Sequence, residues 1–416
     1  MTIDTPEKIM AETPALFGGE PAKKSPWGTE KRYGDAELQE LKEALDQDTL
    51  FYAYGKKAGQ LEQEFAARNG VRFGVVCSSG TSAIHSAMMA AGISPGDEVI
   101  TSPVTDMGSI APILFQGAIP VFADLHPHSY TISPDSVEAN ITPRTKAVLA
   151  VHLWGNACDM NALLDICNRH NLTLIEDCAQ AFGCTYDGKP VGTIGRMGCF
   201  SFNEFKHIAC GDGGIIITDD EALASKLRLS TDKCYSRDEK ATIRDPWFLA
   251  NNYRMTELQA AVALAQLKKL DSIVARRRKW CTALSKELSA IKGISVPQPT
   301  PGCDPSWWFY MLRVDEKLLG ANVDEFTEAV KAEGLSGGAH YTGRCIYEYP
   351  VMLDHSAFDH ASHAYSAQKY AHGLCPTAEE ILDTCFIHAC HEAFTEQDLQ
   401  EVIHGFKKVA AWFNNR

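Results

Sequence analysis

Short apolar runs that alternate with helical stretches constrain the fold of this chain more than any other feature. Buried strands of this kind, with helices between them, are typical of a mostly parallel α/β sheet that helices cover on both faces. The predicted strands are 74–77, 98–101, 119–123, 147–152, 172–176, 199–202 and 214–218, and the helices between them include 81–91, 107–116, 160–170 and 221–229.

The pattern changes near residue 254, where a long helical region is predicted at 256–291. A chain of 416 residues is too long for one ordinary core. The long helical region would link two domains. We therefore predict an irregular N-terminal arm at 1–30, a large domain at 31–270 and a smaller α+β domain at 271–416.

Composition excludes several classes of protein. The net charge of -14 makes nucleic acid a poor partner, although a local cationic pocket can sit within an acidic surface. The sequence contains no apolar run of about 18 residues, so no membrane span is predicted. The N-terminal residues do not resemble a secretory signal. The 14 cysteines fall in predicted core segments without a CxxC pair, so we expect reduced thiols and a cytoplasmic protein.

A turn of small residues follows the first predicted strand. The letters CSSGTS at 77–82 place Ser79, Gly80 and Thr81 where a strand ends and a helix begins. Backbone N–H groups at a helix N-terminus, together with small hydroxyl side chains, suit a dianionic phosphate. An ordinary strand-to-helix turn with a Ser/Thr cap has the same letters, so this motif alone leaves both interpretations open.

A carboxylate follows another predicted strand. The letters LIEDCAQ put Asp177 at the end of the apolar run, where ligands of open α/β sheets bind. There it could pair with a protonated ring nitrogen of a ligand, although a capping aspartate is a common alternative. Strand alternation points the neighbouring Glu176 to the other face.

A lysine lies in a glycine-rich loop between two more strands. The letters SFNEFKHIACGDGG carry Ser201 at a strand end and Lys206 five residues later. Lysine is rarely buried without a role. Burial lowers the pKa of its amine, which favours covalent attachment to a carbonyl group. Ser201 would add a hydroxyl group to a phosphate site.

The pattern Ser-Phe-x3-Lys-x4-Gly-(Asp/Glu)-Gly-Gly in this loop resembles the signature of the DegT/StrS family of aminotransferases. The resemblance runs from about residue 17 to the C-terminus. It implies the fold type I of transferases that depend on pyridoxal 5′-phosphate (PLP). It also implies that Lys206 holds PLP as a Schiff base, and that Asp177 pairs with the pyridine nitrogen, which makes the cofactor a better electron sink.

Other segments agree with the family in order and spacing. Gly80 and Thr81 resemble its phosphate turn, and Gln180 resembles the residue beside the cofactor ring. The letters NYRMTELQ at 252–259 resemble an element whose asparagine reaches the phosphate in the neighbouring subunit, so Asn252 implies a homodimer with shared sites. Many members stack an aromatic residue on the ring, where this chain has TDMGS at 105–109; Met107 or Asp106 would cover the ring instead.

The family resemblance implies transfer of an amino group from glutamate or glutamine to a nucleotide-linked keto-sugar or to a keto-cyclitol. Some members are dehydratases in which histidine replaces the lysine, but this chain keeps Lys206. A sugar dehydratase, an aminohydroxybenzoate-type synthase and a non-catalytic PLP-binding regulatory protein are the alternatives.

Two C-terminal regions contain further polar residues. His340, Tyr341 and Arg344 are candidates for the substrate mouth, and an ordinary loop is the alternative interpretation. The spacing in the tail matches no zinc template, so no metal is expected. The tail residues considered are His355, His360, His363, Cys385, His388, Cys390 and His391.

Overall fold

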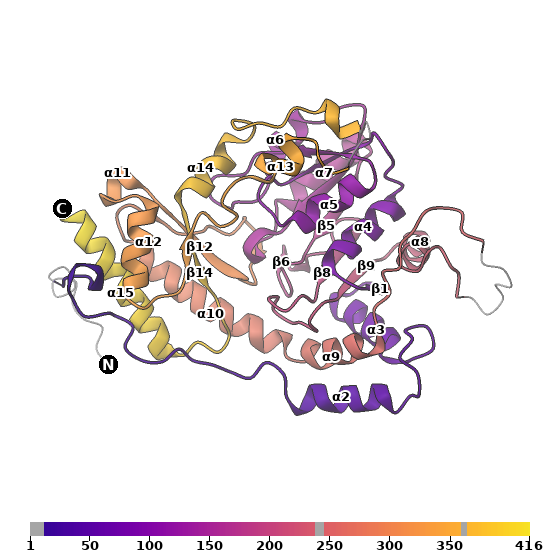
Figure 1. The fold of residues 1–416 in the computed structure, drawn as a ribbon, viewed down its shortest axis with the longest axis horizontal. Coiled ribbons are helices and arrows are strands. Elements are labelled where there is room, and N and C mark those ends of the chain that lie inside the picture. The colour runs from indigo at the N-terminus through magenta and orange to yellow at the C-terminus, as the bar shows by residue number, and fades with distance from the viewer. Residues whose placement is uncertain (1–11, 238–244, 359–363) are drawn as a thin grey trace.

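A seven-stranded sheet lies at the centre of the larger part of the molecule (Figure 1). The structure is a computed structural model that describes residues 12–237, 245–358 and 364–416. The strands of this sheet are β1 (Phe73–Cys77), β2 (Glu98–Thr101), β3 (Ile119–Phe122), β4 (Thr145–Val151), β5 (Thr173–Asp177), β8 (Met197–Ser201) and β9 (Gly214–Thr218). Their order is β1-β9-β8-β5-β4-β2-β3. Only β9 runs antiparallel to its neighbours, so the mostly parallel sheet predicted from the sequence is confirmed.

Helices cover both faces of this sheet, as the apolar strands require. Along β9, Ile216 packs into the core on one face, whereas Ile215 and Ile217 pack into the core on the other. The helices of this part are α2 (Asp35–Leu45), α3 (Lys57–Asn69), α4 (Gly80–Ala91), α5 (Met107–Phe115), α6 (Pro134–Ala139), α7 (Met160–His170), α8 (Glu221–Thr231) and α9 (Glu257–Leu267).

The predicted helical region 256–291 is two helices rather than one. The chain turns at Lys268 and Lys269, and then α10 (Leu270–Leu288) runs toward the smaller sheet (Figure 1). At the turn, Nζ of Lys268 lies 2.8 Å from Glu40 and Nζ of Lys269 lies 2.6 Å from Glu37. Both carboxylates belong to α2, so this ion-pair network holds the turn against α2.

A second, antiparallel sheet lies beyond α10. Its order is β10 (Ile294–Ser295), β12 (Phe309–Val314), β14 (Cys385–Ala389) and β13 (Gly338–Ala339). The helices α12 (Val323–Ala332) and α15 (Glu396–Asn414) pack on this side of the molecule (Figure 1). The predicted division of the chain near residue 270 stays a prediction.

The remaining elements are β6 (Thr185–Tyr186), β7 (Lys189–Pro190), β11 (Cys303–Asp304), α11 (Glu316–Leu319), α13 (Pro350–Leu353), α14 (Pro376–Thr384) and the 3-10 turns η1 (Ala15–Phe17), η2 (Leu153–Gly155), η3 (Ile346–Glu348) and η4 (Ala364–Ala367).

An extended arm precedes α2 and runs beneath α10 (Figure 1). Glu333 accepts hydrogen bonds from the backbone N–H groups of Ala15 and Ala22, at 2.8 and 2.7 Å. Nζ of Lys23 lies 2.8 Å from Asp398 and 2.7 Å from Glu401, both on α15. The arm is therefore fixed to the side of the molecule that holds the smaller sheet.

None of the described helices combines the length and the apolar character that a membrane crossing requires.

Candidate active site

The predicted site residues meet at one edge of the large sheet. Strands β1, β2, β4, β5 and β8 all point their carboxyl ends to this edge, because β9 is antiparallel to both β1 and β8. The turn after β1, Asp177 at the end of β5 and Ser201 at the end of β8 therefore lie at the same edge. This is where open α/β sheets bind their ligands.

The N-terminus of α4 offers free donors at this edge. Ser79 caps the helix: its Oγ accepts from the N–H of Ser82 at 3.0 Å, and its own N–H donates to Oγ of Ser82 at 2.8 Å. In the part of the chain that the structure describes, the N–H groups of Gly80 and Thr81 have no hydrogen-bond acceptor. Such N–H groups, at the positive end of the helix dipole, form an anion site.

Two glycines bring the walls of this anion site together. A Cβ atom on Gly80 would lie 2.6 Å from Cβ of Ser201, and one on Gly214 would lie 2.3 Å from the carbonyl oxygen of Ser79. Neither position leaves room for a side chain. The glycine-rich end of the lysine loop and the turn after β1 therefore form one continuous cradle, with the Ser201 hydroxyl beside the helix N-terminus.

Asp177 is a buried carboxylate with a relative exposure of only 5%. Its Oδ2 accepts from Oγ of Ser109 at 2.7 Å, and its Oδ1 accepts from the N–H of Ala179 at 3.1 Å. Burial raises the pKa of Asp177, while these two hydrogen bonds and the charge of Lys206 oppose the shift. A cationic ligand group at this carboxylate would offset the cost of burying its charge.

Lys206 lies on the loop between β8 and β9, and its amine faces the same edge. Nζ lies 3.9 Å from the centroid of the Trp308 ring. Burial lowers the pKa of Lys206, while the charges of Asp177 and Asp106 oppose that shift. A lysine in this environment has more of the neutral, nucleophilic amine at neutral pH than a solvated lysine has.

The other predicted site residues differ in the contacts that their side chains make. Gln180 is buried, its Oε1 accepts from the N–H of Trp154 at 2.8 Å, and its Nε2 donates to the Tyr341 hydroxyl at 3.3 Å. Tyr341 is thus beside the site, whereas both ring nitrogens of His340 contact other groups, Leu382 O at 3.0 Å and Asp324 at 3.1 Å.

Three further candidate residues are Met107, Asp106 and Arg344. Met107 is partly buried as the first residue of α5, and Asp106 caps this helix by accepting from the N–H of Gly108 at 2.7 Å. Arg344 is exposed, with Nη1 3.5 Å from the carbonyl oxygen of Glu348. The roles predicted for these side chains toward a cofactor or a substrate stay predictions.

Asn252 differs from the rest because it is exposed, and its side chain makes no hydrogen bond within the described ranges. Its backbone forms a bridge with Asp232. The Asp232 carboxylate is fully buried and accepts from the Tyr52 hydroxyl at 2.8 Å, from Arg237 Nε at 2.5 Å and from Arg254. The backbone at Asn252 is thus held in place, while its side chain is exposed and has no hydrogen-bond partner among the described residues.

Comparison with known proteins assigns the chain to a family. The model of the DegT/DnrJ/EryC1/StrS aminotransferase family matches residues 31–407. The chain belongs to this aminotransferase family. The family, the fold and the aminotransferase activity predicted from the motifs are confirmed.

This DegT/DnrJ/EryC1/StrS aminotransferase is similar to proteins of sugar metabolism. It is 38% identical to the spore coat polysaccharide biosynthesis protein SpsC of Bacillus subtilis, over 90% of this chain and 95% of the relative. It is 34% identical to the GDP-perosamine synthase of Caulobacter vibrioides, over 87% and 92%. The structure of DesI in the presence of its TDP-sugar product is 27% identical and superposes with a TM-score of 0.81 over 96% of this chain and 97% of that one.

The residues of this aminotransferase fit the cofactor that the family implies, PLP. The cradle between α4 and Ser201, which a Cβ on Gly80 would fill, has unpaired N–H donors for a phosphate. Buried Asp177 suits a protonated pyridine nitrogen, and Lys206 has an amine with a lowered pKa. The three groups share one edge of the sheet, as a single ligand with a phosphate, a ring nitrogen and an aldehyde requires.

Three contributors to the site of this aminotransferase were not assigned from the sequence. Ser109 supports Asp177, Trp308 covers the amine of Lys206, and Arg32 binds the backbone of the lysine loop. Ser109 lies in the segment 105–109, in the first turn of α5, and a small polar residue there has no local pattern that predicts its partner. Trp308 and Arg32 belong to distant segments that carry no local signal.

Two histidines of the C-terminal region have structural contacts. Nδ1 of His388 lies 2.6 Å from Ser336 O, and Nε2 of His355 lies 2.8 Å from Gln368 O. His360 and His363 lie outside the described residues.

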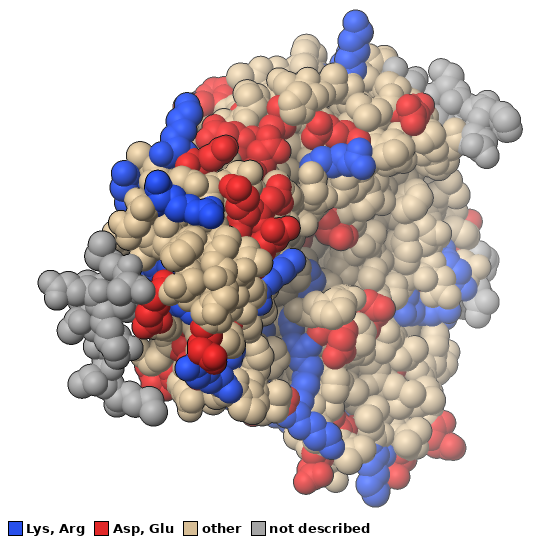
Figure 2. Space-filling model, turned by 60° about the vertical axis from the view of Figure 1, so that its left-hand side comes forward, with Lys and Arg blue, Asp and Glu red and all other residues tan. Residues whose placement is uncertain are grey.

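Figure 2 shows Lys and Arg side chains along a hollow on one face of the molecule, so the acidic net charge does not prevent local cationic surface.

Proposed function

We propose that this aminotransferase binds PLP through Lys206 and Asp177, with Ser79, Gly80, Thr81 and Ser201 at the phosphate. The observation that carries the proposal is the meeting of the buried Asp177, the Lys206 amine and the open N-terminus of α4 at one edge of the sheet. Met107 and Gln180 would line the ring, and Tyr341, beside Gln180, would face the substrate, together with the less central His340 and Arg344.

The residues have separate tasks in amino transfer. PLP would supply the electron sink that stabilises the negative charge formed at the substrate carbon. Asp177 would hold a proton on the ring nitrogen as the partner of an ion pair. Lys206, once its amine is free, would take the proton from the α-carbon of the amino donor at Nζ and return it during transfer. The lowered pKa of Lys206 suits a group that must accept a proton near neutral pH.

We propose a nucleotide-linked keto-sugar as the amino acceptor and glutamate or glutamine as the donor. Two relatives support a sugar, because their names refer to GDP-perosamine synthesis and to spore coat polysaccharide biosynthesis. A structure named for a complex with its TDP-sugar product supports the nucleotide part. A keto-cyclitol is the alternative acceptor with similar ring hydroxyl groups.

A panel of acceptors tests this proposal. The enzyme is first converted to its aminated form with glutamate or glutamine, and the return of the starting absorbance is followed with each acceptor. We expect GDP- or TDP-linked keto-sugars to react at least about 100-fold faster than pyruvate or oxaloacetate, because a site built around substrate hydroxyls rejects analogues that lack them. If simple keto acids are the best acceptors, the sugar proposal is wrong while the PLP proposal survives.

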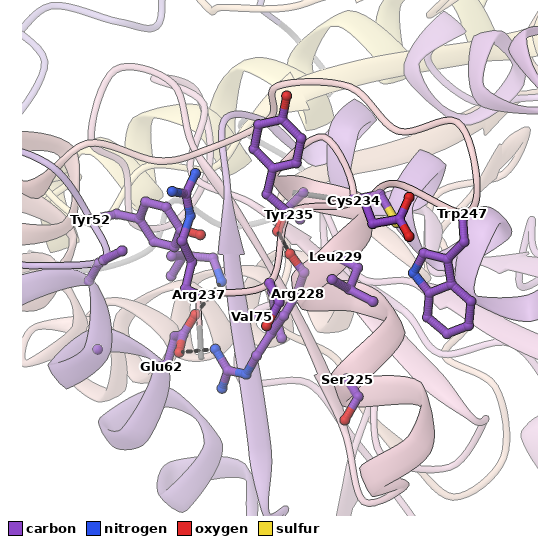
Figure 3. A pocket seen from close by; sticks show the side chains of 17 residues that line it. Tyr52, Glu62, Val75, Ser225, Arg228, Leu229, Cys234, Tyr235, Arg237 and Trp247 are labelled. Carbon is purple, nitrogen blue, oxygen red and sulfur yellow. Dashed lines mark hydrogen bonds and ion pairs between the residues drawn. The ribbon is translucent and has the colours of Figure 1, made fainter. Parts of the chain in front are cut away.

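We also propose a homodimer in which Asn252 of one subunit completes the site of the other. Its exposed, unpaired side chain supports this role. Nearby, Trp247 and Leu249 are 75% and 95% exposed, which is unusual for large apolar side chains. A pocket of about 680 Å³ adjoins them, with Arg237, Tyr52 and Trp247 among its lining residues (Figure 3). An open apolar surface beside a pocket is suited to a second copy of the chain.

Mixing two inactive variants tests the shared site. We expect Asn252→Ala and Lys206→Ala subunits to be poorly active alone. In a mixed dimer both lesions would fall in one site and leave the other intact, so verified exchange should restore up to about a quarter of the wild-type activity. Each variant mixed with wild type is the control. No recovery after verified exchange would mean that Asn252 does not act across the interface.

A cytoplasmic location is also proposed. All 14 cysteines are free thiols, and 12 of them are buried. Reduced thiols in core positions suit a reducing compartment.

A further inference from the structure

The loop that carries Lys206 has neither helix nor strand, yet side chains from outside the loop bind four consecutive backbone carbonyl groups, 204–207. Arg32 donates from Nη1 to Glu204 O and from Nη2 to Lys206 O and, at 3.3 Å, to the carbonyl oxygen of residue 207. Nε1 of Trp308 donates to the remaining carbonyl, that of Phe205, at 2.8 Å. Within the described chain, these four carbonyl groups are thus bound by the side chains of Arg32 and Trp308 rather than by a regular ladder.

Arg32 is itself held in place. Its carbonyl oxygen accepts from Nε2 of Gln266 at 3.0 Å and from Nζ of Lys269 at 2.9 Å. The hydroxyl of the next residue, Tyr33, donates to Oε2 of Glu204 at 2.5 Å. A guanidinium group is a planar fork of donors, so a fixed arginine can hold several carbonyl oxygens at defined positions.

Trp308 adds a second restraint, on the side chain rather than the backbone of the lysine. Besides the hydrogen bond from its indole to the loop, its ring lies 3.9 Å from Nζ of Lys206. Trp308 immediately precedes β12, and Arg32 precedes α2. The lysine loop is therefore fixed from two separate parts of the chain.

We propose that Arg32 and Trp308 are positioning residues that hold the Lys206 loop in the geometry needed to capture the cofactor. This inference rests on the proposed PLP function. The physical reason is that covalent capture requires the amine within reaction distance of a carbonyl carbon, and a displacement of about 1 Å can slow such a step about 100-fold. Loss of either side chain would remove this clamp, the set of hydrogen bonds from Arg32 and Trp308 to the loop, and would loosen the loop. Lys206, Asp177 and the residues of the phosphate cradle would all still be present.

Replacing Arg32 with methionine tests the clamp, because methionine keeps an unbranched chain without N–H donors. Arg276→Met is the matched control, since Arg276 is exposed and pairs with Glu30 at 2.7 Å without contacting the loop. We expect Arg32→Met to slow covalent capture of added PLP about 10- to 100-fold, followed by absorbance and borohydride trapping. Arg276→Met should stay within about twofold of wild type.

Amide hydrogen exchange in the cofactor-free protein gives a readout that does not depend on activity. Peptides covering 203–208 should exchange faster in Arg32→Met than in Arg276→Met, because released carbonyl groups leave the loop free to open. Arg32→Lys should resemble Arg32→Met, since a lysine keeps the charge but lacks the fork. Trp308→Phe, which keeps a ring but loses the indole N–H, should show a smaller change in the same direction.

The outcomes separate this inference from the proposed function. If wild type forms no adduct on Lys206, the PLP assignment is wrong. If wild type forms it and Arg32→Met matches Arg276→Met in both capture and exchange, only the clamp is overturned. If Arg32→Met does not fold, Trp308→Phe decides: unchanged capture and exchange there overturn the clamp, and slower capture with faster loop exchange supports it.

Discussion

Replacing Lys206 with alanine is expected to abolish the covalent attachment of PLP and to lower amino transfer by about 10⁴-fold or more. The reason is that Lys206 would be both the attachment point and the group that moves the proton. The wild-type enzyme should be yellow and should lose its visible band on borohydride reduction. Peptide mapping should then find the reduced cofactor on Lys206, and the variant should show no tagged peptide.

Lys286→Ala is the control for this experiment, because Lys286 is an exposed residue of α10. It should retain the band, the tag and the activity. A tag on a lysine other than Lys206 in the wild-type enzyme would contradict the assignment, whatever the activity of the alanine variant.

The Asp177→Asn variant is expected to bind PLP but to turn over about 100-fold more slowly or worse, a loss comparable with removal of one electrostatic donor at a reacting group. An amide cannot form an ion pair with the pyridinium, so the electron sink weakens. The phosphate cradle between α4 and Ser201 is unchanged, and affinity should largely persist. Equilibrium titration with PLP and steady-state kcat measure the two effects separately.

Ser109→Ala gives a graded comparison for Asp177. It removes the hydrogen bond to Oδ2 but leaves the carboxylate, so kcat should fall less than in Asp177→Asn. Near-normal turnover of Asp177→Asn would reject the role of the carboxylate. A loss of PLP binding as severe as the loss of turnover would instead assign Asp177 to affinity rather than to chemistry.

Much of the fold could be predicted because buried strands have a strong local pattern. The predicted strands 98–101 and 214–218 match β2 and β9, and the convergence of Asp177 and Ser201 followed from their places at strand ends. The antiparallel direction of β9 was not specified by its apolar run, because an apolar run has no direction. The break at Lys268 was missed for a similar reason, since both sides of it have good helix formers.

The rest of the site depends on contacts between distant segments. Trp308 and Arg32 lie far from Lys206 in the chain, and neither a Trp-Trp pair nor an arginine in an irregular arm indicates what it will touch. His340 and Tyr341 are adjacent in sequence, yet only Tyr341 contacts Gln180. Local patterns predict which residues occur at strand ends, whereas tertiary packing decides which loop residues join them.

The arm that runs beneath α10 has a consequence for limited proteolysis. It is fixed by Lys23 to α15 at one end and by Arg32 to the lysine loop at the other. Between these points the backbone has no helix or strand and is held by side-chain contacts: the N–H groups of Ser25 and Gly28 donate to Glu401 and Asp398 of α15, and Glu30 pairs with Arg276. A protease nick between residues 24 and 31 would leave the polypeptide of the large sheet uncut, yet it would cut the covalent link that the arm makes between its contacts on α15 and its contacts on the loop that bears the lysine.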